Sequence, residues 1–341
     1  MKSEKWERVH GFRPGSLVLF PGALGDFICL LPTLELIGQA SRVDLLARIE
    51  FADLVSSSVA VRSLECDAIS RLFVPGAGDG QRLRSFFDSY ASIYSWFGSD
   101  QLVFADELRR ASQGKALLFS FRPFHDGTHQ IDYYLSCLEI TPGGVPFIPV
   151  KRDANAWCDD YWRRHALEKK PVLALAPGSG AREKNWPVAS YRAVADWWRE
   201  KVGGIVLVVF GPVEEDRGAL DSICDGALVA RGLTLAQLSA LLSRCVLYVG
   251  NDSGTTHLAA ALGVRTVALF GPSDRRRWAP RGGKVTVMTK RLDCSPCAIT
   301  TMKSCPHRDC LVTLEPAGVI KRLESLPELA TLTRWGVEIT V

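Results

Sequence analysis

The segment Leu247–Phe270 reads LYVGNDSGTTHLAAALGVRTVALF. The apolar runs Leu247–Val249 and Thr266–Phe270 have the composition of buried strands, and the alanine-rich run His257–Leu262 between them has that of a helix. Gly263 suits the C-terminal cap of this helix. Alternating strands and helices are typical of parallel sheets, so the segment predicts an α/β fold.

The same alternation extends over both halves of the chain. We expect further strands at Leu17–Phe20, Val43–Ala47, Ser92–Trp96, Leu117–Phe119, Val172–Ala176 and Ile205–Phe210, and helices at Phe27–Leu36, Tyr191–Trp198 and Leu235–Leu242. Pro32 interrupts the first of these helices near its middle. The pattern predicts two Rossmann-like, doubly wound parallel-sheet domains, residues 1–155 and 156–341, facing each other across a ligand-binding cleft.

Length and composition are those of a globular protein with two domains. The 341 residues allow two domains of about 150 residues each. The 41 basic and 37 acidic residues leave a net charge of +4, which permits contact with an anionic substrate or membrane but does not indicate a nucleic-acid binder. The start, MKSEKWERVHGFRPG, is too charged for a signal peptide, and no apolar run approaches the roughly 18 residues of a membrane helix. We expect a cytoplasmic protein.

The polar turn Gly250–His257 has the features of an anion site. Unpaired N–H groups and the helix dipole favour an anion at a helix start, and Gly254 lets a phosphate approach the backbone. His257 lies one turn into the helix. Hydroxyl donors come from Ser253, Thr255 and Thr256. The alternative is that Asp252 or Ser253 only caps the helix, which leaves His257 and the threonines unexplained.

A second loop, Ala176–Pro187 (APGSGAREKNWP), also follows a strand and precedes a helix. Its small residues, Ser179 among them, are suited to a backbone nest for a phosphate. Lys184 would neutralise diphosphate charge on a leaving group. Taken alone, the loop is better explained as an ordinary connection with solvated charges.

An acidic turn, Phe210–Asp216 (FGPVEED), follows the strand Ile205–Phe210. An acidic residue at such a strand end can accept hydrogen bonds from both ribose hydroxyls. Glu214 is the candidate. The alternative is an acidic helix N-terminus that the helix dipole favours.

The N-terminal half offers one candidate catalytic residue. Pro21–Asp26 (PGALGD) follows the first strand, so Asp26 lies at the mouth of that sheet. An inverting sugar transfer needs a base that removes the acceptor hydroxyl proton, and a carboxylate is the usual choice in sugar chemistry. The alternative is that Asp26 caps a helix.

Four cysteines lie close together in the sequence, as Cys294-x2-Cys297-x7-Cys305-x4-Cys310. The first pair has metal-ligand spacing, but the second matches no common zinc pattern. A structural zinc site and reduced thiols without a metal both remain open, and the thiols are favoured. A disulfide is disfavoured in the cytosol.

Together these motifs resemble the ADP-heptose:lipopolysaccharide heptosyltransferases of glycosyltransferase family 9. The matching segments are Leu17–Pro32, Pro177–Pro187, Gly211–Glu214, Asp252–His257 with the AAALG helix, Gly271–Asp274 and the Cys-x-Pro-Cys segment. Residues from about 48 to 150 carry no recognised signature.

The resemblance implies a GT-B fold, an ADP-heptose donor, inversion at the anomeric carbon, and neither a cofactor nor a catalytic metal. It implies that Asp26 is the general base and that Glu214 holds the ribose. The remaining implied donor-site and substrate contacts are Gly25, Ser179, Lys184, Asp252, Ser253, Gly254, Thr255 and His257. Members often have a basic residue where Phe20 stands, so an anionic group of the acceptor would be held differently here or be absent.

The leading hypothesis is heptosyl transfer from ADP-heptose to an anionic glycolipid, the lipopolysaccharide inner core, at the cytoplasmic membrane face. Three alternatives stay open: transfer of another sugar in polysaccharide or glycoprotein synthesis, a nucleotide-sugar epimerase, and a non-catalytic sugar-nucleotide binder. An epimerase needs further acid and base groups around the sugar, and the N-terminal half offers only Asp26. The joint presence of Asp26, Lys184, Glu214 and His257 argues against a pure binder.

Overall fold

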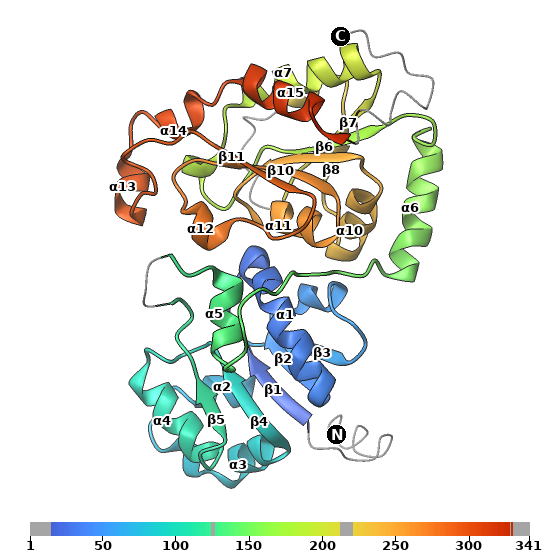
Figure 1. The fold of residues 1–341 in the computed structure, drawn as a ribbon. Coiled ribbons are helices and arrows are strands. Elements are labelled where there is room, and N and C mark those ends of the chain that lie inside the picture. Colours follow the sequence, from blue (N-terminus) through green and yellow to red (C-terminus); the bar gives the residue numbers. More distant parts are fainter. Residues whose placement is uncertain (1–14, 124–126, 212–220, 328, 330–341) are drawn as a thin grey trace.

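The computed structural model describes residues 15–123, 127–211, 221–327 and 329, which form two parallel sheets, each packed with helices (Figure 1). The N-terminal sheet contains β1 (Gly15–Leu19), β2 (Val43–Ala47), β3 (Val59–Ser63), β4 (Tyr90–Ser95) and β5 (Ala116–Leu118), in the order β3-β2-β1-β4-β5. The C-terminal sheet contains β6 (Val172–Ala176), β7 (Ile205–Val209), β8 (Leu228–Ala230), β9 (Leu247–Asn251), β10 (Arg265–Phe270) and β11 (Val285–Thr289), in the order β11-β10-β9-β6-β7-β8. The predicted pair of parallel α/β sheets is confirmed.

The strands that sequence analysis missed are edge strands. β3, β8 and β11 lie at the ends of their sheets, and most of their side chains are only partly buried or exposed. An edge strand has a neighbour on one side only, so its sequence needs no continuous apolar run. The predicted central strands, by contrast, agree with the structure to within two residues.

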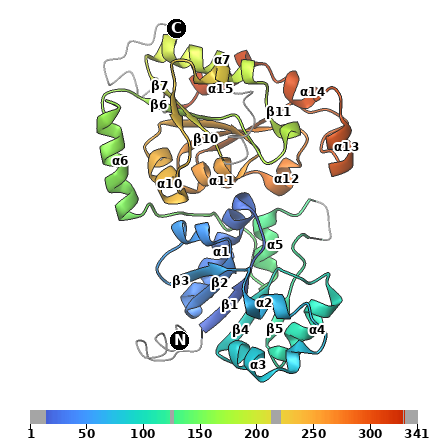
Figure 2. The ribbon, with the colours of Figure 1, turned by 180° about the vertical axis from the view of Figure 1, so that it is seen from behind.

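Pro32 does not end the first helix. α1 (Leu24–Ala40) continues through it, although a proline removes one helical hydrogen bond. Phe27, Leu30 and Leu34 are at most 2% exposed, and this burial offsets the loss. The first turns of α1 face the C-terminal domain, and the helix continues from there alongside the N-terminal sheet (Figure 2).

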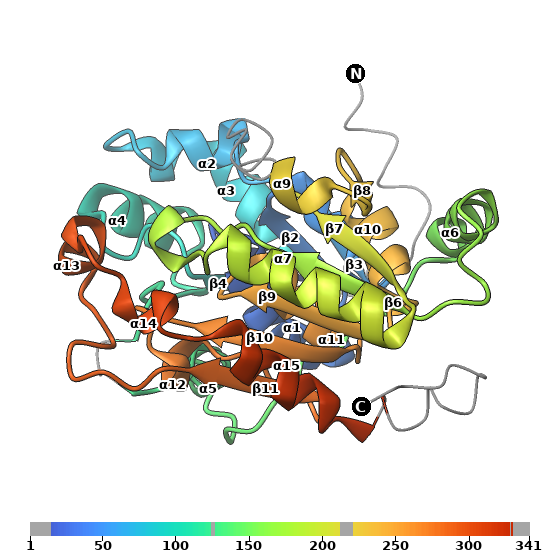
Figure 3. The same ribbon diagram turned by 90° about the horizontal axis from the view of Figure 1, so that it is seen from above.

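The chain crosses between the domains after α5 (Gln130–Ser136) and reaches α6 (Arg152–Arg164), seen at the side of the molecule in Figures 1 and 2. α6 packs on α10 (Leu235–Ser243) of the C-terminal domain, where the Cys158 thiol lies 3.4 Å from the Ala240 carbonyl oxygen. Residue 155, the predicted boundary, falls within α6. The outer side of the C-terminal sheet is covered by α7 (Val188–Trp197) and α15 (Pro316–Glu324) (Figure 3).

The two domains are in direct contact. α1 packs against α11 (Gly254–Ala261), which follows β9. The Ile148 N–H donates to the Ala261 carbonyl at 3.1 Å, and Arg281 forms a bidentate ion pair with Asp132, with Nη1 2.6 Å from Oδ1. These contacts fix the relative placement of the residues that face each other across the domain boundary.

Candidate functional site

A cavity of about 190 Å³ lies where the two domains meet. Both walls come from turns that follow a central strand, since β1 leads into α1 and β9 leads into α11. The predicted site residues that line this cavity are Gly25, Asp26, Lys184, Asp252, Ser253, Gly254 and His257. Side chains far apart in the sequence thus share one small polar space.

The starts of α1 and α11 abut at this cavity. A Cβ atom at Gly254 would lie 2.8 Å from Cβ of Leu24, and one at Gly25 would lie 3.3 Å from Cδ2 of His257. Interdomain packing is therefore a reason for glycine at both positions, besides the phosphate approach expected for Gly254. Two helix N-termini directed at one space make it favourable for an anion.

Asp26 caps the start of α1 and also lines the cavity. Its Oδ2 atom accepts the Ala23 N–H at 3.3 Å, as a helix cap, and its Oδ1 atom lies 2.5 Å from Nη1 of Arg122. The Asp26 side chain is 12% exposed. One carboxylate oxygen thus orients the residue, while the other faces the cavity beside a cation.

Arg122 is itself held between aromatic rings from both domains. Its guanidinium carbon lies 4.1 Å from the ring centroid of Phe121 and 4.6 Å from that of Trp278. Trp278 ends α12 (Arg275–Trp278) in the C-terminal domain. Stacking of this kind restrains a guanidinium while leaving its N–H groups free to bind.

The cavity wall contributed by the C-terminal domain contains an ion pair. Nζ of Lys184, at the end of the short helix Arg182–Lys184, lies 2.8 Å from Oδ2 of Asp252. The two side chains are 29% and 9% exposed. Any diphosphate bound here must share Lys184 with Asp252 or displace that carboxylate.

Asn251 fastens the loop that carries Lys184 to the strand that precedes Asp252. Its side-chain amide donates to the Pro177 carbonyl at 2.7 Å and accepts the Trp186 N–H at 2.9 Å. The Asn251 side chain is fully buried, so these bonds are shielded from water. These hydrogen bonds join the two predicted phosphate loops to each other.

Two predicted contacts point into the loops rather than into the cavity. The hydroxyl of Ser179, 3% exposed, lies 2.6 Å from the Ala181 carbonyl and 2.6 Å from Oδ1 of Asn185. The hydroxyl of Thr255 lies 3.0 Å from that of Tyr248. Both residues are outside the lining of the cavity.

His257 is buried between the domains. Burial lowers its pKa, against the opposing effect of the Asp252 and Asp26 carboxylates. Its Nδ1 atom lies 3.9 Å from the Cys29 thiol, whose pKa burial raises. With its pKa below the ordinary value, the imidazole of His257 is uncharged at neutral pH.

Sequence reasoning missed Arg122 and Trp278. Arg122 lies just beyond the predicted strand Leu117–Phe119, at the sheet edge where ligands bind, and this placement was the available signal. Trp278 follows a run of three arginines, and nothing in the sequence around it indicated a role in the site. Glu214, the expected ribose ligand, lies outside the described residues.

None of the four clustered cysteines is in a disulfide. In the described ranges, no group of three or more histidine, cysteine, aspartate or glutamate side chains is arranged to hold a metal ion. None of the helices in these same ranges is long and apolar enough to cross a membrane.

Comparisons with known proteins agree with this architecture. The family model of glycosyltransferase family 9 (heptosyltransferase) matches residues 108–306. Lipopolysaccharide heptosyltransferase 3 of Escherichia coli is 28% identical over 166 residues, which are 45% of this chain and 48% of that protein. Among solved structures, the glycosyltransferase family 9 protein of Veillonella parvula has a TM-score of 0.74 at 19% identity, over 93% of this chain and 97% of that one. The E. coli ADP-heptose lps heptosyltransferase II has a TM-score of 0.70 at 19% identity, over 93% and 99%.

The family model covers more than half of the chain, so the chain belongs to glycosyltransferase family 9, the heptosyltransferase family. The chain spans about half the length of the curated relatives it matches. The solved structures share its two-domain arrangement, which establishes the GT-B fold.

Proposed function

We propose that the protein is an inverting heptosyltransferase that moves a heptose from ADP-heptose to an inner-core acceptor of lipopolysaccharide. The observation that carries this proposal is the interdomain cavity, where Asp26 of one domain faces Lys184 and the start of α11 from the other. Family membership and the names of the relatives support the donor and the acceptor. A lipopolysaccharide acceptor implies work at the cytoplasmic face of the inner membrane, with peripheral contact.

In the proposed reaction Asp26 is the general base. Its Oδ1 atom takes the proton of an acceptor hydroxyl as that oxygen attacks the anomeric carbon of the heptose. The bond from the anomeric carbon to the diphosphate breaks, and its electron pair leaves with ADP. Attack on the face opposite the leaving group inverts the anomeric configuration. Arg122 holds the carboxylate in place through their ion pair.

The opposite wall receives the leaving diphosphate. Lys184, the Ser253 and Gly254 backbone at the start of α11, and the imidazole of His257 would stabilise its negative charge. Asp252 lines the same site, and its ion pair with Lys184 holds the lysine side chain at the cavity. A lysine and two helix starts supply positive charge from the protein itself, so we propose a metal-independent transfer.

The remaining proposed contacts act around this centre. Gly25 lets α1 approach α11, while Ser179 and Thr255 stiffen the two phosphate loops through their hydroxyl contacts. Glu214 stays the proposed ribose ligand, because the acidic turn follows β7, the neighbour of β6 in the sheet.

Calorimetric titration with ADP, UDP and GDP, first in a chelator and then with Mg²⁺, tests the donor. We expect ADP to bind most tightly and Mg²⁺ to leave its affinity unchanged. Preference for UDP or GDP would remove the heptose donor from the proposal. Dependence on Mg²⁺ would remove metal independence.

A further inference from the structure

A second cavity, of about 560 Å³, lies in the N-terminal domain. Arg122 lines both this cavity and the interdomain one, and it pairs with Asp26 of the interdomain site. Its walls come from the segments after β1, β4 and β5, at Pro21, Trp96–Gln101 and Ser120–Arg122. This is the carboxyl edge of the N-terminal sheet, where parallel sheets bind their ligands.

The walls of this cavity are largely aromatic. Phe73, Phe97 and Phe121 line it, and the Phe73 side chain is 46% exposed. The ring centroid of Phe73 lies 6.1 Å from that of Phe97 and 5.1 Å from that of Phe104, which backs the wall. Exposed rings set in a concave surface offer apolar faces on which the C–H face of a sugar ring can stack.

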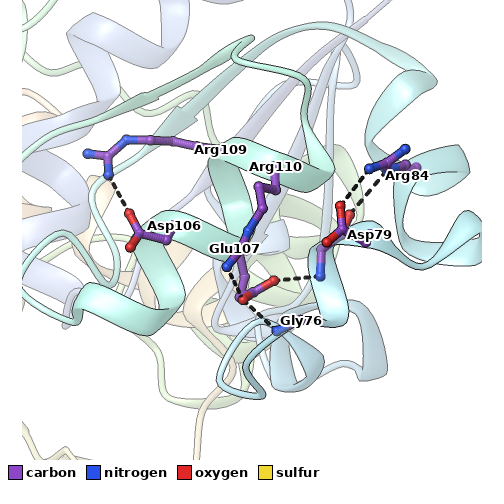
Figure 4. Close-up of polar contacts among 8 residues, drawn as sticks. Gly76, Asp79, Arg84, Asp106, Glu107, Arg109 and Arg110 are labelled. Carbon is purple, nitrogen blue, oxygen red and sulfur yellow. Dashed lines mark hydrogen bonds and ion pairs between the residues drawn. The ribbon is translucent and has the colours of Figure 1, made fainter.

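The Phe73 wall is fixed in place from below. Glu107, 1% exposed on α4 (Leu102–Ala111), accepts the Gly76 N–H at 2.7 Å and the Gly78 N–H at 2.6 Å, and it pairs with Arg110 (Figure 4). These bonds tie the segment that follows Phe73 to a helix of the domain. A stacking surface that is ordered before the ligand arrives loses less entropy on binding.

The charge of this cavity is close to balanced. In the part of the chain that the structure describes, its ionisable lining residues are Asp100 and Arg122, and the latter already pairs with Asp26. Phe20, the residue before Pro21, is a fully buried ring against Phe121 and Tyr134 rather than a cation. Tight recognition of phosphate groups uses several arginine or lysine donors, whereas the described lining of this cavity supplies Arg122 alone.

We propose that this cavity is the acceptor subsite and that it selects an uncharged sugar ring, stacked on Phe73 and Phe97, instead of a phosphorylated one. The Asp100 carboxylate accepts hydrogen bonds from the sugar hydroxyls, and Arg122 connects the subsite to the base. The glycolipid can still carry phosphates elsewhere, outside the cavity. That the bound ring acts as the acceptor rests on the proposed transferase function. That the cavity binds an uncharged ring does not.

The first test measures binding without the donor. Core oligosaccharide from lipopolysaccharide is prepared with its phosphates and after their chemical removal, and each form is titrated by saturation-transfer NMR. We expect the dephosphorylated form to bind within about threefold of the phosphorylated one. Loss of binding by more than about tenfold on dephosphorylation, equivalent to 1.4 kcal/mol, overturns the proposal.

Variants then locate the bound ring. Phe73→Ala should weaken binding of the dephosphorylated oligosaccharide about tenfold, and Asp100→Asn about threefold, since one stacked ring or one hydrogen bond contributes on that order. Leu102→Ala is the matched control, because Leu102 is 80% exposed and lies outside the cavity lining. ADP affinity, measured on each variant, checks that the fold and the donor side are intact. Unchanged oligosaccharide binding in both Phe73→Ala and Asp100→Asn overturns the proposal.

A transfer assay with ADP-heptose separates this inference from the proposed function. Binding that depends on Phe73, without transfer to either oligosaccharide, would refute the heptosyltransferase function and leave the neutral-ring site standing. Transfer that requires the phosphorylated form would refute the neutral-ring site and leave the function standing.

Discussion

The two sides of the interdomain site are built in different ways. The donor side consists of two short loops after β6 and β9, joined by the buried Asn251 and closed by the ion pair of Lys184 and Asp252. The proposed acceptor side consists largely of aromatic residues spread from Phe73 to Phe121, with Asp100 and Arg122 as its ionisable residues in the described part of the chain. A diphosphate must be met by fixed charges and N–H groups, whereas a sugar ring needs a shaped apolar surface.

This difference explains where sequence motifs are found. Binding of a phosphate requires particular residues at particular spacings. The proposed donor side is therefore visible in the sequence as short motifs such as Asp252–His257. An aromatic wall can be assembled from any segments that the fold brings together. Its residues need no fixed spacing.

The largest expected effect is that of Asp26→Asn, which should lower the rate of transfer without changing donor binding. It keeps the cap to the Ala23 N–H but removes the base, so kcat should fall by about 10³-fold, in the range of general-base catalysis. ADP should bind as it does to the unsubstituted protein, because Asp26 is proposed to contact the acceptor and not the diphosphate. Steady-state kinetics and calorimetry measure the two quantities. A variant that still transfers at more than a tenth of the original rate would exclude Asp26 as the base.

Lys184→Ala should act on the opposite side. Loss of a charge-assisted contact to the diphosphate is expected to weaken ADP binding about 100-fold, or near 3 kcal/mol. Binding of the acceptor oligosaccharide should not change. Because the substitution leaves the Asp252 carboxylate without Lys184, the double variant Lys184→Ala/Asp252→Asn is the control for a local electrostatic defect. Unchanged ADP affinity in the single variant would remove Lys184 from the site.

Glu107→Ala tests whether the acceptor wall depends on its buried anchor. The change leaves two backbone N–H groups without their acceptor and should lower the free energy of unfolding by about 2 kcal/mol. Asp106→Ala is the matched control, because the neighbouring Asp106–Arg109 pair is exposed and should contribute less than about 1 kcal/mol (Figure 4). Urea denaturation measures both. Equal effects of the two substitutions would contradict the anchoring role.

Glu107 also predicts an acid sensitivity. Burial acts to raise its pKa, but the Gly76 and Gly78 N–H groups and Arg110 outweigh burial, and the net pKa lies below the usual value. A depressed carboxyl pKa stabilises the folded state above the unfolded pKa, and this stabilisation is lost as the pH falls below about 4. The wild-type protein should therefore lose more stability in that range than Glu107→Ala does.

The sequence was informative where physical demands are local. The central strands and the turn Gly250–His257 could be predicted because buried strands and phosphate loops restrict composition over a few consecutive residues. The placement of Asp26 at a strand end followed from the same rule. The structure brings Asp26 and Lys184 to one cavity, although they are distant in the chain.

The remainder could not be predicted because it depends on tertiary packing. Arg122 acquires its role only when Phe121 and Trp278, from different domains, enclose its guanidinium. The ion pair of Lys184 with Asp252 likewise arises only once both loops are folded. Edge strands such as β3 and β11 have too little burial to mark them in the sequence.

The smallest expected effect is that of replacing His129, whose side chain links the two domains. His129, at the start of α5, accepts the Ile131 N–H on Nδ1, and its Nε2 lies 2.8 Å from the Ala279 carbonyl of the other domain. Nε2 therefore carries the proton in the neutral ring. Burial lowers the pKa of His129 to about 4, with a further contribution from nearby Arg281.

The unfolded chain, with a histidine pKa near 6.5, binds more protons than the folded one between pH 4 and about 6.5. Stability from this contact is thus fully present above about pH 6.5 and falls as the pH drops towards 4. His129→Gln should flatten the dependence of Tm on pH in that window, with exposed His165→Gln as the control. His129 contacts Ala279 of the other domain and lies outside the lining of both cavities. Its loss at neutral pH should therefore change ADP and acceptor affinities by the same small factor. A change confined to one substrate would show instead that the two sides are adjusted separately.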